Sequence, residues 1–268
     1  MSAPKKARTQ PQYELLYHPG IPGRGEFIRL CFEATGVSFT DVAVEKKDGY
    51  SEVQSICMNT TLESADGNPP VFSPPAQRVP GSGKNGKPHI ISQTPNILMY
   101  LATRLGLVPD DEVSKYHVYQ LALTALDLNN EIHDTHHPLA VAKYYEEQKD
   151  AALLKAADVR ANRLPKFFSY FERNLKHNAG ENGNGGQGKY LVGSKLTFAD
   201  LVVWQVLDGV QFSFPKEIEA RRGEFPELLG TFYESVKGEG GLGEYLGSER
   251  RMPYSEGIFR YYPELDRQ

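Results

Sequence analysis

Cysteine and tryptophan are scarce in this chain of 268 residues, which contains two cysteines and one tryptophan. Two cysteines cannot form a disulfide framework, and so few of them fit a reducing compartment. Cys31 lies in an apolar helical pattern, which predicts a core position rather than a nucleophile. Cys57 lies in a polar stretch and indicates no role.

Long apolar runs and an excess of positive charge are also absent. No run approaches the roughly 20 residues that span a bilayer, so we expect no membrane partner. The net charge is −4 and the sequence pI is about 6.0, which argues against a general nucleic-acid-binding surface. Residues 1–11 are basic without an apolar core, which excludes a secretory signal and predicts a disordered tail.

The region that follows mixes strand and helix patterns. Residues 13–18 read as a strand, and 24–35 as a helix with one apolar stripe that ends at Gly36. Residues 37–44 alternate apolar and polar side chains, as a half-buried strand does. This β-α-β order predicts a parallel strand pair. Residues 76–79 and 89–91 then form a predicted hairpin around a long turn.

Residues 88–101 contain the most informative corner of the chain, a short strand that leads into a helix. We expect Thr94 at the N-cap and Pro95 at the first helical position, where a missing N–H costs nothing. The corner offers the Gln93 amide, the Thr94 hydroxyl and free N–H groups at the positive end of a helix. Such a corner suits a small carboxylate, although strand-to-helix corners of this kind are also common structural elements.

From Asp110 onward helical patterns replace strands. One predicted helix runs to about His137, a second from Ala142 to about Asn174, and residues 178–188 read as a flexible surface insertion. Helices after a mixed region indicate two domains, the second a helical bundle.

A capping box marks the start of a later buried helix. Thr197 is the predicted N-cap and Asp200 the third helical residue, with Leu196 and Leu201 at the positions of a hydrophobic staple. This device serves folding, so neither Thr197 nor Asp200 is a catalytic candidate.

Three ordered motifs resemble the cytosolic glutathione transferases of the tyrosine type. They are the strand, loop and Gly-Arg-Gly helix start in residues 13–29, the Gln-Thr corner, and the Leu-Thr-x-Ala-Asp motif at 196–200. The resemblance covers residues 12–250, with a slightly longer first loop. It implies a thioredoxin-like α/β N-terminal domain at 12–105 and an all-α C-terminal helical bundle at 110–250. It also implies a homodimer in the cytoplasm; residues 251–268 form a tail.

The same resemblance implies the site residues. Tyr17 would activate the glutathione thiol, since the loop 19–25 has no serine or cysteine, as serine- and cysteine-type members would. The Gln93 and Thr94 pair would hold the γ-glutamyl carboxylate. Without the resemblance, Tyr17 reads as an ordinary aromatic residue at a strand end.

Further site candidates follow from the same resemblance. Arg24 would reach the γ-glutamyl end or the thiolate region, or else be a solvated arginine. Lys47 would meet the glycine carboxylate, or else belong to a polar loop. The glutathione backbone would pair beside a cis-proline, which leaves Ser73, Pro74 and Pro75 as candidates. Pro75 fits the hairpin better, whereas Pro74 follows a residue with an N–H.

The implied function is conjugation of the glutathione thiolate to hydrophobic electrophiles, with glutathione as co-substrate and no metal or other cofactor. A hydroxyl that donates to the sulfur favours the anion, and the thiolate is the nucleophile. Two alternatives stay open. One is a glutathione-dependent isomerase or ether-cleaving enzyme, and the other is a non-catalytic carrier or structural protein that binds hydrophobic ligands.

Three further segments each allow more than one interpretation. His133, His136 and His137 are spaced to share a helical face, which favours packing or a second-substrate pocket over a metal site. Asp127 or Asn129 would face glutathione across a dimer interface. The aromatic tail from Met252 would form a lid or pack as an extended segment on the bundle.

Overall fold

The structure, a computed structural model, describes residues 13–63, 65–181 and 188–268. Its contacts divide the chain into two units. The first comprises the chain up to Pro19 together with Val37–Ile97, and the second comprises Gly20–Gly36 and Leu98–Gln268. The predicted tail at 1–11, and residues 182–187 of the predicted insertion, lie outside the described residues.

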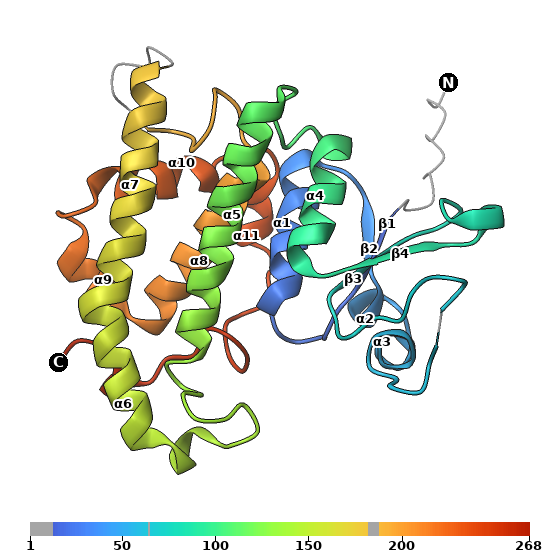
Figure 1. The fold of residues 1–268 in the computed structure, drawn as a ribbon, viewed down its shortest axis with the longest axis horizontal. Helices are drawn as coiled ribbons and strands as arrows, with labels where there is room; N and C mark the ends of the chain where they lie inside the picture. Colours follow the sequence, from blue (N-terminus) through green and yellow to red (C-terminus); the bar gives the residue numbers. More distant parts are fainter. Residues whose placement is uncertain (1–12, 64, 182–187) are drawn as a thin grey trace, which may run out of the picture. The chain divides into compact units, whose positions relative to one another are not determined.

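The first unit is built on a mixed four-stranded sheet in the order β2-β1-β3-β4 (Figure 1). β1 is parallel to β2 and antiparallel to β3, and β3 is antiparallel to β4. The predicted parallel pair and the predicted hairpin are therefore confirmed. The strands are β1 (Tyr13–Leu16), β2 (Phe39–Asp41), β3 (Ala76–Val79) and β4 (His89–Ser92).

Two short helices, α2 (Val42–Glu45) and α3 (Gly49–Cys57), follow β2. The prediction of a strand over 37–44 is wrong beyond Asp41. The Asp41 N–H donates to the Glu45 carboxylate at 2.7 Å, which closes a helical turn and overrides the alternating pattern. At Gly49 an added Cβ would lie 1.7 Å from the Val42 carbonyl oxygen, so only glycine allows the two helices to approach this closely.

Both cysteines are buried, each in the core of its own unit. Cys57 packs with Leu16, Val42 and Val53 in the first unit, and burial raises the pKa of its thiol to about 12. Cys31 belongs to the larger core of the second unit, where burial likewise raises its pKa. The predicted core position of Cys31 is confirmed, and burial disfavours the thiolate form of both cysteines.

The second unit is helical. A 3-10 turn (Gly23–Gly25) precedes its first helix, and π-helical segments cover Val159–Arg163 and Glu227–Phe232. The prediction of one helix from 142 to 174 is wrong, because α6 starts only at Lys149 and the π-helical segment separates it from α7. The boundary between the units falls within α4. The helices are α1 (Glu26–Thr35), α4 (Thr94–Leu105), α5 (Glu112–His133), α6 (Lys149–Asp158), α7 (Leu164–Glu181), α8 (Phe198–Ser213), α9 (Pro215–Arg221), α10 (Tyr233–Lys237) and α11 (Leu242–Leu246).

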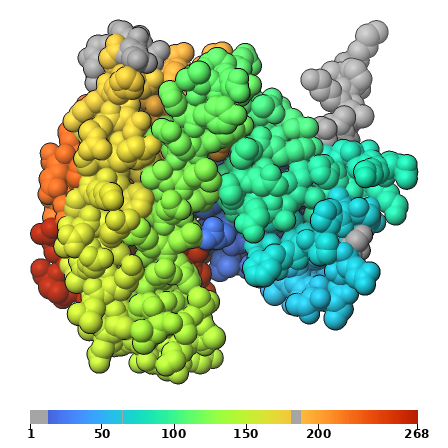
Figure 2. Space-filling model, in the orientation of Figure 1, coloured from blue at the N-terminus to red at the C-terminus, as the bar shows by residue number. Residues whose placement is uncertain are grey.

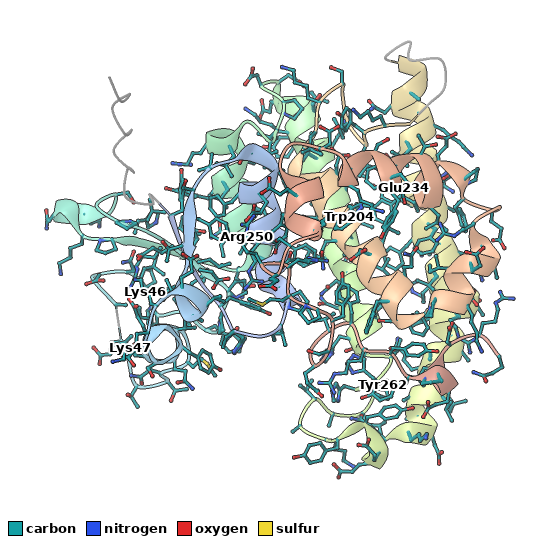
Figure 3. All side chains as sticks on the ribbon, turned by 180° about the vertical axis from the view of Figure 1, so that it is seen from behind. Lys46, Lys47, Trp204, Glu234, Arg250 and Tyr262 are labelled. Atoms are coloured by element: carbon teal, nitrogen blue, oxygen red, sulfur yellow. The ribbon has the colours of Figure 1, made fainter. Side chains whose placement is uncertain are left out.

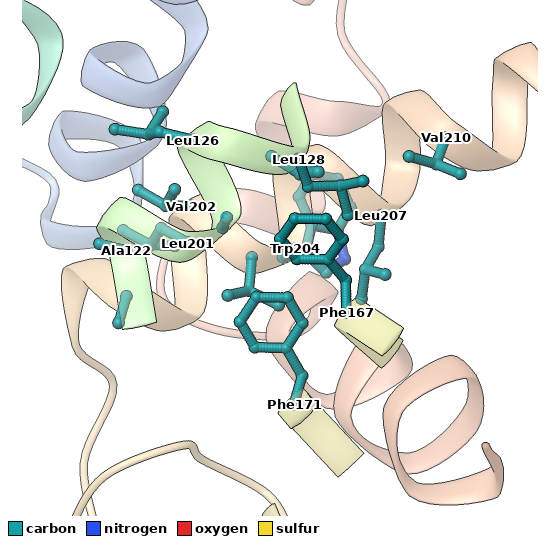
Figure 4. Packing of buried hydrophobic residues seen from close by; sticks show 14 of the residues in the cluster. Ala122, Leu126, Leu128, Phe167, Phe171, Leu201, Val202, Trp204, Leu207 and Val210 are labelled. Atoms are coloured by element: carbon teal, nitrogen blue, oxygen red, sulfur yellow. The ribbon is translucent and has the colours of Figure 1, made fainter. Parts of the chain in front are cut away.

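α8 occupies the centre of the second unit and packs extensively on α5. Trp204 of α8 is almost fully buried, and its indole N–H donates to the Tyr233 carbonyl at 3.0 Å. Phe167 and Phe171 of α7 belong to the same apolar cluster (Figure 4). A helix that is apolar around most of its circumference needs such cover on every side.

The capping box at the start of α8 is confirmed. Thr197 is the N-cap, and the Asp200 carboxylate accepts the Thr197 N–H at 2.7 Å and its hydroxyl at 2.8 Å. The second Asp200 oxygen accepts the Leu191 N–H at 2.8 Å. One buried carboxylate therefore fixes both the helix start and the loop that leads to it.

The buried side chain of Gln148 organises the loop between α5 and α6. Its side-chain oxygen accepts the Leu139 N–H at 2.9 Å, and its side-chain nitrogen donates to the carbonyls of Ala140 and Lys143 at 3.1 Å. This residue, Gln148, thus satisfies backbone groups that a helix would otherwise pair. The expected helix from Ala142 is replaced by an ordered loop.

The C-terminal segment packs as an extended chain on the helical unit, which was one of the two predicted alternatives. The Tyr262 ring stacks on Tyr145 at 3.8 Å between centroids. The Phe259 ring fills the space beside Gly209, where an added Cβ would lie 2.4 Å from the ring. The His136 Nε2–H donates to the Ile258 carbonyl at 2.9 Å.

The three histidines near this segment gather for a reason other than the predicted helical face. α5 ends at His133, so His136 and His137 lie in the turn beyond it. Their rings are nevertheless only 4.8 Å apart, and each lies 5.1 Å from the His133 ring. Among the described residues no group of three histidine, cysteine or acidic side chains is arranged to hold a metal ion.

Acidification should loosen the C-terminal segment through His136. Burial, with the neighbouring His133, Arg260 and His137 charges, lowers the His136 pKa to about 3. The unfolded chain binds this proton at its ordinary pKa of 6.5, so stability falls as the pH falls below that value. We expect a loss of roughly 1–2 kcal/mol by about pH 5 in denaturant titrations.

The variant His136→Gln, which keeps a side-chain N–H donor, should remove most of this loss. His117→Gln, at an exposed position on α5, is the matched control and should keep it. Equal pH dependence in wild type and His136→Gln would contradict the assignment.

Candidate functional site

The strand register gathers the candidate residues of the first unit along one edge of the sheet. Leu16 at the end of β1 pairs with Ala76 at the start of β3, and Ala76 pairs with Ser92 at the end of β4. Tyr17, Pro75 and Gln93 each adjoin one member of this row. Neighbouring strands lie about 4.8 Å apart, so Tyr17 and Gln93 leave the sheet about 10 Å from each other.

Tyr17 stands directly after β1 and is 5% exposed. Its ring meets the His18 ring edge-on at 5.2 Å, and the His18 Nδ1 lies 3.0 Å from the Tyr50 hydroxyl. Burial lowers the His18 pKa, so the imidazole beside Tyr17 is neutral at pH 7. Sequence reasoning missed Tyr50, because no local pattern relates a residue of α3 to the end of β1.

The corner after β4 is formed by a residue in an unusual backbone conformation. Gln93 has φ +72°, the left-handed region, and its side chain is exposed. Its carbonyl accepts the Ile97 N–H at 2.9 Å, the first hydrogen bond of α4. The N-cap is therefore Gln93, and the prediction of Thr94 at that position is wrong by one residue. A non-glycine residue held in this region costs about 1–3 kcal/mol and occurs most often at functional sites.

Thr94 is the first residue of α4 and is 2% exposed. Its hydroxyl is buried and has no hydrogen-bond partner among the described residues. A buried hydroxyl without a partner is uncommon. Together with the unpaired N–H groups of the first helical turn, it gives this corner more donors than acceptors, as a carboxylate site requires.

The segment before β3 contains the predicted cis-proline. The peptide bond between Pro74 and Pro75 is cis, which decides between the two alternatives in favour of Pro75. Ser73 is exposed, and so is Phe72, with 90% of its surface accessible. Because Pro74 has no N–H, the residue before the cis bond offers only its carbonyl group.

Two lysines follow α2, and they differ in their surroundings (Figure 3). Lys46 donates to Glu14 at 2.8 Å and lies 3.5 Å from Glu52. Burial acts to raise the Glu14 pKa, but hydrogen bonds from Arg78 and Lys46 hold it below its usual value. Lys47 is exposed and has no ion-pair partner among the described residues. It is therefore the lysine available to a ligand carboxylate.

Arg24 belongs to the second unit, where its guanidinium donates to the Asn130 side chain of α5. The start of α1 is held by a buried charge cluster. Glu26, which is fully buried, accepts the Tyr245 hydroxyl at 2.7 Å and pairs with Arg29 at 3.1 Å. Arg29 also donates to the Pro22 carbonyl at 3.2 Å. These contacts fix the loop and turn that carry Arg24.

A groove of about 790 Å³ runs between α5 and α7, which lie side by side in Figure 2. Charges of both signs line it: Asp127 is exposed there, and Glu131 binds Arg163 through two hydrogen bonds of 2.6 and 2.8 Å. Asn129 is fully buried, so the prediction that it could face a partner subunit is wrong. Asp127 remains the candidate for that role.

Several known proteins to which this chain is similar are glutathione S-transferases. Residues 133–249 match the family model described as "Glutathione S-transferase, C-terminal domain". The chain is 23% identical to a glutathione S-transferase of Plasmodium falciparum, with 90% of this chain and 98% of that protein covered. It is 27% identical to glutathione S-transferase P 1 of Xenopus laevis, over 90% of this chain and 94% of that protein.

Solved structures show the same fold. The Pi-class glutathione S-transferase of Onchocerca volvulus has a TM-score of 0.59 at 24% identity, with 88% of this chain and 92% of that chain covered. The sigma-class enzyme of Fasciola hepatica has a TM-score of 0.63 at 19% identity, with 91% and 98% covered. Over most of its length the chain is therefore similar in sequence and in fold to cytosolic glutathione transferases, and residues 133–249 match the model of their C-terminal domain. In the described residues no helix is long and apolar enough to cross a membrane.

Replacement of Gln93 by glycine should separate stability from ligand binding. Glycine adopts the left-handed conformation without strain, so Gln93→Gly should be as stable as wild type, or more stable by up to about 1 kcal/mol. Loss of the amide should raise the KM for glutathione roughly 10-fold or more, since a hydrogen bond to a charged group contributes about 1.5–3 kcal/mol.

Gln93→Asn is the matched control, because asparagine tolerates this backbone region and keeps a shorter amide. Its KM should lie between those of wild type and Gln93→Gly. An unchanged KM in Gln93→Gly, or a large loss of stability, would contradict the role given to this corner.

Proposed function

We propose that this glutathione transferase activates the glutathione thiol with the Tyr17 hydroxyl and transfers the sulfur to hydrophobic electrophiles. The observation that carries the proposal is the register row Leu16–Ala76–Ser92, which puts Tyr17 and the Gln93 corner on one sheet edge. In the proposed reaction the thiolate forms a carbon–sulfur bond, and the electrophile loses its leaving group or, in an addition, gains a proton.

An extended tripeptide suits this edge in the order of its groups. The γ-glutamyl and cysteinyl residues would cover the roughly 10 Å from β4 to β1 across β3, and the glycine would continue towards β2. The γ-glutamyl carboxylate would bind Gln93, Thr94 and the first turn of α4. The tripeptide backbone would lie along Ser73–Pro75, the sulfur beside Tyr17, and the glycine carboxylate near Lys47, which follows β2 on the outer side of β1.

A single hydroxyl is energetically sufficient for activation. A thiol with a pKa near 8.5 is only a few per cent ionised at pH 7. A decrease of about 2 units requires about 2.7 kcal/mol of preferential stabilisation of the anion, and one charge-assisted hydrogen bond supplies about 1.5–3 kcal/mol. The low accessibility of Tyr17 strengthens such a bond, because less water competes for the sulfur.

Tyr17→Phe tests this role directly. The variant keeps the ring and removes the hydroxyl, so kcat/KM with a generic aromatic electrophile should fall by roughly 10–100-fold near pH 6.5. The apparent pKa of the rate profile should rise by about 1–2 units, while the KM for glutathione changes little. Stopped-flow or absorbance assays across pH supply both quantities.

Tyr13→Phe is the matched control, because Tyr13 is equally buried at the opposite end of β1. It should keep the wild-type profile. Wild-type activity in Tyr17→Phe would assign activation to another group. A wild-type protein that binds glutathione without turnover would instead support the carrier alternative.

We further propose that the protein works in the cytoplasm as a homodimer, in which a second copy covers Phe72, the most exposed of the large apolar side chains in the described residues. An aromatic ring that is 90% exposed on an ordered loop is a strong candidate for an interface anchor. Phe72→Ser should therefore shift the mass in light scattering from dimer to monomer at micromolar concentration. The control Leu154→Ser, at a 76% exposed position on α6, should stay dimeric. A monomeric wild type, or equal behaviour of both variants, would contradict the proposal.

A further inference from the structure

A second cavity lies within the helical unit. None of the described residues that line it is assigned to glutathione. It measures about 370 Å³ and is lined by α6 and the π-helical segment, by α9 and by the C-terminal end of the chain. Figure 1 shows the red C-terminal end beside α9 and α6. Its size lies at the lower end of the range for small-molecule sites.

Arginine dominates the lining of this cavity. Arg160, Arg221 and Arg267 contribute three positive charges, and Glu217 is the acidic side chain among the lining residues. Ala157 and Ala161, one helical turn apart, and Gln268 complete the lining. Arginine therefore outnumbers acidic side chains in this lining.

Two of the arginines are held firmly by Glu217, which is 2% exposed. Its carboxylate accepts the Arg221 Nε–H at 2.6 Å and the Arg267 Nε–H at 2.8 Å. Arg221 also donates to Glu224 at 2.9 Å. The backbone here is fixed as well, because the Asp266 carboxylate accepts the N–H groups of Lys216 and Glu217 at the start of α9.

Arg160 differs from the other two. Its backbone carbonyl accepts an Arg221 N–H at 2.9 Å, which places its chain against Arg221. Its own guanidinium has no acidic partner among the described residues, and its Nε–H is buried without a hydrogen-bond acceptor. A buried donor of a charged group without an acceptor costs free energy, so such a group calls for a ligand or bound ion.

We propose that this cavity binds the phosphate group of a small phosphate monoester, with Arg160 as its principal ligand and Arg267 as the second. A phosphate monoester carries about −1.5 to −2 charges at pH 7, which suits a lining rich in arginine. The planar guanidinium fork matches phosphate oxygens. The organic part of the ligand lies against Ala157 and Ala161, where the cavity has room beyond a single phosphate.

Phenyl phosphate, inorganic phosphate and benzoate are the probes, titrated against the full-length protein by calorimetry. Phenyl phosphate should bind at least 10-fold more tightly than benzoate, which has the same ring but a single negative charge. It should also bind more tightly than inorganic phosphate, because its ring contacts the alanine wall. Equal affinity for inorganic and phenyl phosphate would overturn the monoester assignment.

Arg160→Gln should weaken phenyl phosphate binding 10-fold or more, since it removes one or two charge-assisted hydrogen bonds. Arg173→Gln, at an exposed arginine of α7, removes the same charge and should bind as wild type. Equal weakening in both variants, or wild-type affinity for phenyl phosphate in Arg160→Gln, would overturn the proposal. Glutathione conjugation by Arg160→Gln should equal that of wild type, so the result is independent of the proposed transferase mechanism.

Discussion

The pairing of β1, β3 and β4 is the constraint on which the candidate site depends. Because Leu16, Ala76 and Ser92 stand opposite one another, the residues that leave or enter these strands share one edge. A slip of one residue in either pairing would turn every side chain to the other face of the sheet. The register is held by the small core beneath it, in which Leu16, Ala76 and Ile90 pack with residues of α2 and α3.

The corner after β4 shows how local strain and a missing hydrogen bond coincide at one place. Gln93 holds a left-handed backbone while its side chain points to solvent, and Thr94 buries a hydroxyl that no neighbour satisfies. Each feature costs free energy in the free protein. In the proposed complex, hydrogen bonds from the Gln93 amide, the Thr94 hydroxyl and the helix N–H groups to the ligand carboxylate would offset these costs. In this account the corner is arranged for its ligand rather than for maximal stability.

The helical unit follows a different principle, in which buried charges fix the ends of elements. Glu26 ties α1 to α11 through Tyr245, Asp200 joins the start of α8 to the loop before it, and Asp266 caps α9 from the C-terminal segment. Arg160 differs from these residues, because its buried Nε–H has no acceptor among the described residues. The contrast with the paired Arg221 and Arg267 in the same cavity is the basis for proposing a ligand there.

Local signals in the sequence were sufficient for much of the fold. The capping box at Thr197, the hairpin after Ala76 and the apolar stripe of α1 are each set by residues near one another in the chain. Elements that depend on a single side-chain contact could not be predicted in this way, because such a contact leaves no periodic pattern in the sequence. The Glu45 carboxylate turned a predicted strand into α2, and the Gln148 side chain organised a loop where a helix was expected. At the site, residue types near the strand ends could be proposed, but the left-handed Gln93 and the approach of His18 to Tyr50 depend on tertiary structure.

The central claim is that the protein stabilises the thiolate of bound glutathione at Tyr17. The most direct measurement is a titration of that thiolate by ultraviolet difference absorbance in the binary complex, without any electrophile. We expect an apparent thiol pKa about 2 units below the value of roughly 8.5 for a free thiol. A bound thiol that ionises at the free value would contradict the account, even if conjugation were observed.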